Sequence, residues 1–243
     1  MIKKVDYPFY FQSELNKKFN IVFDFFLPRL CPCCNKKLNF NETIICIKCF
    51  FELEKTNEYL IKSEYQNKFQ ECGLIDEFKA AFVFRQESPV QFLLHSLKYD
   101  KRFLVGIFLG RLLAKFFLDE IKSWNADFII PVPLHRLKKA ERSFNQSEYI
   151  AKGISRETNV KIKTKLLKRK RFTETQTHLS QIERMQNVKN AFEVKNALSI
   201  KGKKIILVDD VVTTGSTINE CAKVVKDAGA EKIYGLFVAT VPH

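Results

Sequence analysis

One stretch, residues 205–217, constrains the fold of this chain more than any other part of the sequence. It consists of four apolar residues, two acids, two apolar residues and the turn Thr-Thr-Gly-Ser-Thr. The apolar run Ile205–Val208 predicts a parallel strand buried on both faces, with Asp209 and Asp210 at its carboxyl end. The glycine permits a tight turn, and N–H groups at the start of the next helix can converge on an anion. Because carboxylates repel phosphate but suit sugar hydroxyls or a divalent cation, the stretch predicts a ribose-phosphate site.

The rest of the chain alternates between segments typical of strands and of helices. This alternation predicts an α/β fold in which crossover connections build a parallel sheet flanked by helices. A helix is expected to begin at Ser88-Pro89, since serine can cap free N–H groups and proline suits the first helical position. The other expected strands are 80–84, 128–130 and 232–240, and the other expected helices are 104–121 and 145–158.

Five of the seven cysteines lie close together near the N-terminus. Cys31 and Cys34, with Cys46 and Cys49, form two Cys-x-x-Cys pairs separated by a short spacer. Four thiolates at this spacing predict a closed, tetrahedral structural Zn²⁺ site, with buried free thiols as the alternative. Cys33 leaves the register open, because it could replace Cys34 as a ligand. So short a module buries little core, so metal binding is expected to supply its folding energy.

Charge and hydropathy limit the partners and the location. A formal net charge of +14 on 243 residues favours a polyanionic partner: nucleic acid, a nucleotide or a phosphorylated metabolite. The alternative is that AT-rich coding has enriched the chain in lysine. No apolar run approaches the ~18–20 residues that span a bilayer, and the N-terminus is charged where a secretory signal is apolar. We therefore expect a cytoplasmic protein with no membrane insertion.

Seven of the eleven residues in Lys161–Arg171 are basic and none is acidic. Such a run can bind the phosphates of single-stranded DNA without reading its sequence. Lys168, Arg169 and Lys170 are the candidate nucleic-acid contacts. The alternative is a solvated connector between two elements.

The acidic stretch closely resembles the phosphoribosyl pyrophosphate (PRPP) signature of type I phosphoribosyltransferases. The resemblance implies that the fold is the type I phosphoribosyltransferase fold and that PRPP binds with Mg²⁺. Asp209 and Asp210 would hold the ribose 2′- and 3′-hydroxyls, and the following loop would wrap the 5′-phosphate. The residues implied in that loop are Val211, Val212, Thr213, Thr214, Gly215, Ser216 and Thr217.

Two further segments extend this resemblance. The loop after the strand at 128–130 occupies the position that contacts pyrophosphate in the family, although a proline-stiffened turn with a solvated basic face would look the same. Its implied contacts are Val132, Pro133, Leu134, His135 and Arg136, with Arg142 as a further candidate. Residues 169–188 occupy the position of the catalytic loop that closes over PRPP, although a plain surface helix is the alternative. Its candidate contacts are Arg171, Thr175, Gln176 and Arg184.

Taken together, the motifs resemble the ComF family, whose members are linked to natural DNA uptake in bacteria. The cysteine pairs, Leu94–Tyr99 (LHSLKY), Pro131–Arg136, the TxxQ…LSxxERxxNV stretch and the acidic signature follow the order seen in that family. This chain departs from the family pattern at Ser143, where the family usually has glycine, and at the doubled Cys33-Cys34.

We expect four parts in the chain, and the resemblance, which begins at about residue 28, implies a choice of functions. These parts are an N-terminal appendage (1–30), a zinc-finger module (31–50), a helical linker (51–78) and a phosphoribosyltransferase domain (79–243). The chain would bind PRPP and either transfer phosphoribosyl groups or bind single-stranded DNA alongside the DNA-uptake machinery. The alternative is a nucleotide-salvage phosphoribosyltransferase, but no base-binding segment is recognisable. Neither the acceptor nucleophile nor the oligomeric state can be identified from the residues.

Overall fold

The computed structural model describes residues 28–171 and 188–243. Its centre is a five-stranded sheet in the order β1-β7-β6-β2-β3, in which all neighbours run parallel. The strands are β1 (Glu77–Val83), β2 (Phe128–Pro131), β3 (Lys161–Ile162), β6 (Lys204–Val212) and β7 (Lys232–Thr240). The parallel α/β sheet expected from the sequence is therefore confirmed. Within the described part of the chain, no helix is both long and apolar enough to cross a membrane.

Strand β6 lies in the middle of the sheet, because both of its faces are apolar. Ile206 and Val208 belong to the core on one face, and Ile205 and Leu207 belong to the core on the other. All four residues are fully buried. Successive side chains along a strand point to opposite faces of the sheet, so a continuous apolar run packs against the helices on both faces.

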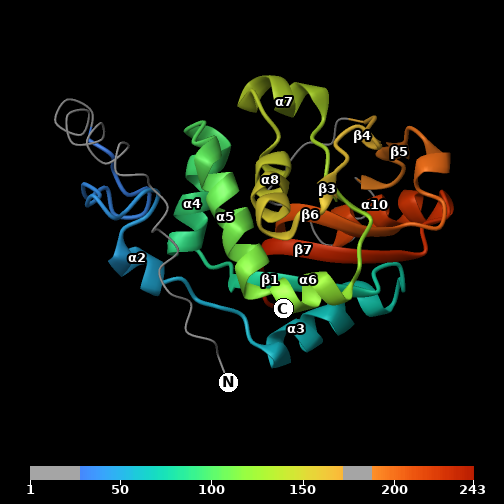
Figure 1. Cartoon of the computed structure of the whole chain (residues 1–243), viewed down its shortest axis with the longest axis horizontal. Coiled ribbons are helices and arrows are strands. Elements are labelled where there is room, and N and C mark those ends of the chain that lie inside the picture. Colours follow the sequence, from blue (N-terminus) through green and yellow to red (C-terminus); the bar gives the residue numbers. More distant parts are fainter. Residues whose placement is uncertain (1–27, 172–187) are drawn as a thin grey trace.

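Helices cover both faces of this sheet (Figure 1). The apolar residues of α4 (Pro89–Tyr99), α5 (Phe103–Phe116) and α8 (Gln146–Thr158) join the core that contains Ile206. The π-helix η1 (Gln66–Gln70) and α10 (Ser216–Asp227) supply the opposite core, and α3 (Glu58–Tyr65) leads into η1. Smaller elements are the helices α2 (Ile47–Phe51), α6 (Leu118–Ser123), α7 (Arg136–Arg142) and η2 (Ala197–Ser199), and the antiparallel pair β4 (Leu167–Arg169) and β5 (Phe192–Val194).

The start of α4 matches the expectation, whereas the helix expected over 104–121 is interrupted. Ser88 Oγ accepts the N–H of Gln91 at 3.3 Å, as a capping serine should. The second helix breaks at Phe117, whose backbone leaves the helical region at φ −119° and ψ 31°. The break turns the chain so that Trp124 stacks on Tyr234, with ring centroids 4.7 Å apart. The apolar periodicity over 104–121 predicted one continuous helix, but tertiary packing divides this segment into α5 and α6.

Glycine allows α5 and α8 to pack with their backbones in contact. A Cβ on Gly110 would lie 2.0 Å from the carbonyl oxygen of Ile150, and one on Gly153 would lie 2.2 Å from that of Ile107. Real Cβ atoms do not approach backbone oxygens so closely. The pair therefore determines how near α8 lies to α5, and both helices pack on the same face of the sheet.

We expect Gly153→Ala to lower the free energy of unfolding by about 3 kcal/mol, because the added methyl group collides with backbone that cannot move aside. The control is Gly73→Ala, since Gly73 has φ +58° and no atom within 4 Å of the added Cβ. That change should cost only about 1 kcal/mol of backbone strain. Urea unfolding measures both, and equal losses would contradict this account of the crossing.

Candidate functional site

The acidic pair lies at a step in the sheet. Strand β2 ends at Pro131, which pairs with Val208, whereas β7 continues beside β6 as far as Val212. Asp209 and Asp210, which the sequence predicts at the carboxyl end of the apolar run, therefore lie within the last residues of β6. They follow the point at which β6 loses its neighbour on one side. Ligands of open α/β sheets bind at such carboxyl ends.

Asp210 is held by three elements. Its Oδ2 lies 2.6 Å from the Nζ of Lys98 on α4 and 3.5 Å from the Nε2 of Gln146 on α8. Its Oδ1 accepts the N–H of Val211 at 2.7 Å. Burial raises the pKa of this carboxyl, but the charge and hydrogen bond of Lys98 and the hydrogen bond from Val211 outweigh it, so the pKa is below its usual value. Asp210 is therefore ionised.

Asp209 has a different environment. Its Oδ1 accepts the Oγ–H of Ser147 at 2.8 Å and the N–H of Asp210 at 2.9 Å. Burial, followed by the negative charge of Asp210, raises the pKa of this carboxyl to about 7. Adjacent carboxylates removed from water resist ionising together, so the second carboxyl of the pair ionises only near neutral pH.

The predicted phosphate turn, residues 213–217, follows at the same edge of the sheet. Gly215 takes a left-handed conformation at φ +78° and caps α10. Thr214 and Ser216 exchange a hydroxyl hydrogen bond of 2.8 Å, and the N–H of Ser216 contacts Thr214 Oγ1 at 3.4 Å. Thr213 is exposed, and Thr217 is half-buried. The first turn of α10 thus presents hydroxyl and N–H groups at a helix N-terminus, which suits an anion.

Helix η1 supports this turn from behind. A Cβ on Gly215 would lie 3.1 Å from the carbonyl oxygen of Lys68, and that oxygen accepts Asn219 Nδ2–H at 2.8 Å. Lys68 in turn forms a fully buried ion pair with Glu64, at 2.5 Å. The segment expected to be a helical linker therefore includes residues that pack against the phosphate turn.

The predicted pyrophosphate loop runs from β2 into α7. His135 is buried and caps α7, accepting the N–H of Leu137 on Nδ1 at 3.3 Å. Asn145 joins this loop to α8, because its Nδ2–H bonds the carbonyl of Val132 at 2.9 Å. Ser143 has φ +67°, so the position where the resemblance expects glycine does need a left-handed backbone. Serine adopts that conformation in this chain.

Basic side chains converge near the acids from α4, α7 and β4. Burial lowers the pKa of Lys138, and the charges of Arg169, Arg142 and Lys98 lower it further. Burial also lowers the pKa of Arg169, while the negative charge of Asp209 raises it. Positive charge therefore lies at both carboxylates, because Lys98 pairs with Asp210 and the charge of Arg169 interacts with that of Asp209. This charge favours an anionic ligand.

Two buried polar atoms at this edge remain available to a ligand. Arg142 Nε and Gln146 Oε1 have no hydrogen-bond partner among the described residues. Buried polar groups in native proteins nearly always have a partner, so a polar ligand is the natural occupant. A ribose phosphate offers both hydroxyl donors and anionic acceptors, and it therefore fits these residues.

The predicted residues are not all gathered at this site. Pro133 and Leu134 are half-buried, whereas Arg136 and Arg171 are exposed, and Thr175, Gln176 and Arg184 fall outside the described residues. Sequence reasoning gave little weight to Lys98, Lys138 and the polar start of α8. For the start of α8 the signal was the SFNQS sequence, residues 143–147, which begins a helix with polar side chains that the core does not need.

The three candidate nucleic-acid residues do not share one face. Arg169 packs its guanidinium over the ring of Phe192 at 5.3 Å, on the side of the buried Leu167. Lys168 and Lys170 are exposed on the opposite side of β4. Lys170 also forms an ion pair of 3.1 Å with Glu193.

The cysteine module contains a candidate metal centre. The sulfur atoms of Cys31, Cys34, Cys46 and Cys49 all lie within 4.8 Å of one another. The Sγ atoms of Cys34 and Cys46 are 3.7 Å apart, close to the ~3.8 Å between sulfurs around a tetrahedral Zn²⁺. Cys33 Sγ instead donates to the carbonyl of Pro89 at 3.5 Å. The register left open by the sequence is therefore the one with Cys34.

The thiol of Cys31 is prepared for metal binding. Burial raises its pKa, but hydrogen bonds from the N–H groups of Cys46, Cys34 and Cys33 outweigh that effect and lower it to about 7. The N–H of Cys46 lies 3.5 Å from the sulfur. Because metals bind the thiolate, these N–H groups favour the ligand form.

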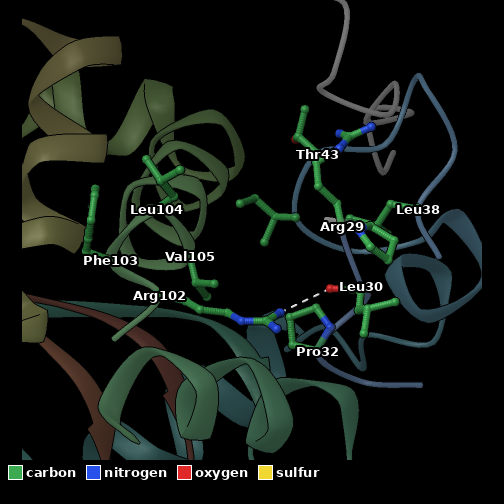
Figure 2. A pocket seen from close by; sticks show the side chains of 11 residues that line it. Arg29, Leu30, Pro32, Leu38, Thr43, Arg102, Phe103, Leu104 and Val105 are labelled. Atoms are coloured by element: carbon green, nitrogen blue, oxygen red, sulfur yellow. Dashed lines mark hydrogen bonds between the residues drawn. The ribbon is translucent and has the colours of Figure 1, made fainter. Parts of the chain in front are cut away.

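A hollow of about 270 Å³ separates the cysteine module from the start of α5 (Figure 2). Leu30, Pro32 and Leu38 line it from the module, and Phe103 and Leu104 line it from α5. Arg102 crosses it and donates to the carbonyl of Leu30 at 3.0 Å. None of its lining residues belongs to the acidic site, so it is a junction between the module and the helices.

Comparison with known proteins agrees with this geometry. Residues 110–241, more than half of the chain, match the phosphoribosyl transferase domain family. Competence protein F of Haemophilus influenzae is 34% identical over 182 residues, which cover 70% of this chain and 79% of that protein. The DNA utilization protein YhgH of Escherichia coli K12 is 35% identical over 148 residues. The alignment with YhgH covers 60% of this chain and 64% of that protein, just under two thirds of its length.

Similarity to solved structures is weaker. A glutamine PRPP amidotransferase from B. subtilis gives a TM-score of 0.38 at 22% identity, over 55% of this chain and 26% of that one. A likeness at that level carries no argument about function.

A parallel sheet covered by helices, with two acids and a glycine-containing turn at its carboxyl edge, is the architecture of the type I phosphoribosyltransferase fold. The chain belongs to the phosphoribosyl transferase family, and its relationship to Competence protein F makes it a ComF-like member of that family.

Proposed function

We propose that this chain is a ComF-like protein of natural transformation that binds PRPP with Mg²⁺ and transfers its phosphoribosyl group. The observation that carries the proposal is the partly buried acidic pair beside an anion-binding turn, surrounded by cations. The names of two relatives, a competence protein and a DNA utilization protein, support the biological setting.

Each part of the site has a role in this proposal. Asp209 and Asp210 receive the ribose hydroxyls, the turn Thr213–Thr217 binds the 5′-phosphate, and Val132–Arg136 faces pyrophosphate. Lys138 and Arg142 add positive charge beside the leaving group. Mg²⁺, held mainly by oxygens of PRPP, would neutralise part of the pyrophosphate charge.

The reaction would exchange one bond at the anomeric carbon for another. The bond to pyrophosphate breaks with its electron pair leaving on the pyrophosphate oxygen. An acceptor nucleophile forms the new bond and loses its proton to the departing pyrophosphate or to water. Positioning and charge stabilisation supply most of the acceleration in such a step, so no dedicated general base is required.

The test is PRPP-dependent thermal stabilisation of the double variant Asp209→Ala with Asp210→Ala. Ligand that binds only the native state stabilises it by about 2.7 kcal/mol at 100 times its Kd, and the variant should lose this gain. The variant should remain folded, because it removes two poorly hydrated carboxylates and little apolar packing. Asp227→Ala, a change to an exposed acid at the end of α10, is the control and should keep the full stabilisation.

Release of pyrophosphate in the presence of candidate acceptors then separates transfer from binding. Turnover with single-stranded DNA would support the proposal, whereas turnover with free nucleobases alone would favour nucleotide salvage instead. A folded double Asp variant that PRPP still stabilises would overturn the proposed site.

Zinc in the cysteine module is a second part of the proposal. Purified protein should contain about one Zn²⁺ per chain by elemental analysis, because four thiolates close a tetrahedral site. Cys49→Ser should lower the zinc content and the stability of the module while leaving PRPP affinity within about twofold. The matched control is Cys33→Ser, whose sulfur contacts Pro89 and lies outside the cluster. Full zinc content in Cys49→Ser would contradict the assignment.

Binding of single-stranded DNA is the second candidate function, supported by the exposed Lys168 and Lys170. We expect Lys168→Gln with Lys170→Gln to weaken DNA binding and to reduce the salt slope by ~0.7 for each phosphate that the variant no longer neutralises. The control, Lys62→Gln with Lys115→Gln, removes the same charge from exposed sites elsewhere. Equal effects of the two pairs would mean that only net charge matters. Fluorescence anisotropy across a salt series provides the measurement.

A further inference from the structure

We propose that Lys98 is a positioning residue for the ribose site: its ammonium group holds the Asp210 carboxylate ready for a sugar hydroxyl, and it acts on the ligand through that carboxylate. The inference rests on the PRPP site proposed above and extends it to α4, an element to which neither the acidic signature nor the phosphate turn belongs.

The contact is short and largely removed from water. Lys98 Nζ lies 2.6 Å from Asp210 Oδ2, with the lysine side chain 23% exposed and the aspartate side chain 9% exposed. An ion pair in such surroundings is screened far less than a surface pair. The position of Lys98 in the last turn of α4 also suits the helix dipole. The dipole does not explain why the Lys98 side chain points toward Asp210, however, because a lysine that interacted only with the helix dipole would extend into solvent.

The remaining hydrogen bonds of the pair show what Lys98 achieves. A carboxylate offers about four acceptor sites. On Asp210, Lys98 and Gln146 occupy Oδ2, and Val211 occupies one site of Oδ1. One acceptor site of Oδ1 therefore remains for a ligand hydroxyl.

The acceptor sites of Asp209 can be counted in the same way. Asp209 Oδ1 already accepts two hydrogen bonds, from Ser147 and from the N–H of Asp210, so its Oδ2 is the atom that remains for a hydroxyl. Each acid thus has one oxygen committed to the protein and one with acceptor capacity left. Without Lys98, the Asp210 side chain would lose its strongest anchor and could rotate away from this arrangement.

The charge of Lys98 also matters to the pair as a whole. Two adjacent carboxylates repel each other, and Lys98 offsets that repulsion at Asp210. Arg169 on β4 interacts electrostatically with Asp209, and Lys138 on α7 interacts with Arg169, Arg142, Glu141 and Lys98. Cys221 on α10 is a further titratable group beside Asp209.

The test compares Lys98→Met, which removes the charge but keeps the length, with Lys98→Arg, which keeps the charge. We expect Lys98→Met to weaken PRPP affinity by about tenfold in isothermal titration with Mg²⁺, and Lys98→Arg to restore most of it. Lys115→Met, a change to an exposed lysine in the last turn of α5, is the control and should bind as wild type does. Circular dichroism checks that each variant is folded.

Removing a counter-ion from a buried carboxylate is destabilising, so Lys98→Gln serves as a second neutral variant that retains a hydrogen-bond donor. It should show the same loss of affinity as Lys98→Met. Wild-type affinity in either folded neutral variant would overturn the proposal. A loss that Lys98→Arg does not restore would also overturn it, because the role assigned to Lys98 depends on its charge.

The failure of this inference is distinguishable from the failure of the proposed function. If the double Asp variant loses PRPP binding and Lys98→Met retains it, the ribose site stands and only the role of Lys98 falls. If wild-type protein does not bind PRPP, both fall.

Discussion

The close contact between α5 and α8 is the constraint on which the functional edge depends. The backbones touch because Gly110 and Gly153 lack side chains, and this contact brings α8 against the sheet. The first residues of α8 thereby reach the acids: Ser147 bonds Asp209, and Gln146 lies against Asp210. A packing requirement at mid-helix, far from any chemistry, thus determines the geometry at the helix start.

Burial of the acidic pair lowers the stability of the fold at neutral pH, and it places two carboxylates where a ligand can bind. Burial raises the pKa of Asp209 to about 7, and each tenfold change in a proton-binding constant corresponds to ~1.4 kcal/mol. An acid whose pKa is raised on folding contributes stability fully below its unfolded pKa and loses that contribution as the pH rises through the folded value. Across roughly pH 4 to 7 this acid therefore makes the fold progressively less stable. Sites that await a charged ligand commonly carry such a cost.

Much of the fold could be predicted because its signals are local. The buried strand around Ile206, the cap at Ser88 and the last strand Lys232–Thr240 all follow from neighbouring residues. The parallel sheet and the clustering of four cysteines were also predicted correctly. The break at Phe117 was missed, since the stacking of Trp124 on Tyr234 that accompanies it joins residues far apart in the chain.

The order of residues along the chain is enough to specify the groups of each site, each in a fixed local order. These groups are two acids and a glycine-containing turn at the functional edge, and two cysteine pairs in the N-terminal module. The tertiary packing determines which side chains from distant parts of the sequence contact these groups. Lys98 reaches Asp210 from α4, Lys68 supports Gly215 from a π-helix, and Cys33 lies outside the cluster of four cysteines. The reason is physical: local order sets backbone conformation and the alternation of faces, whereas pairing across the fold depends on how closely separate elements pack.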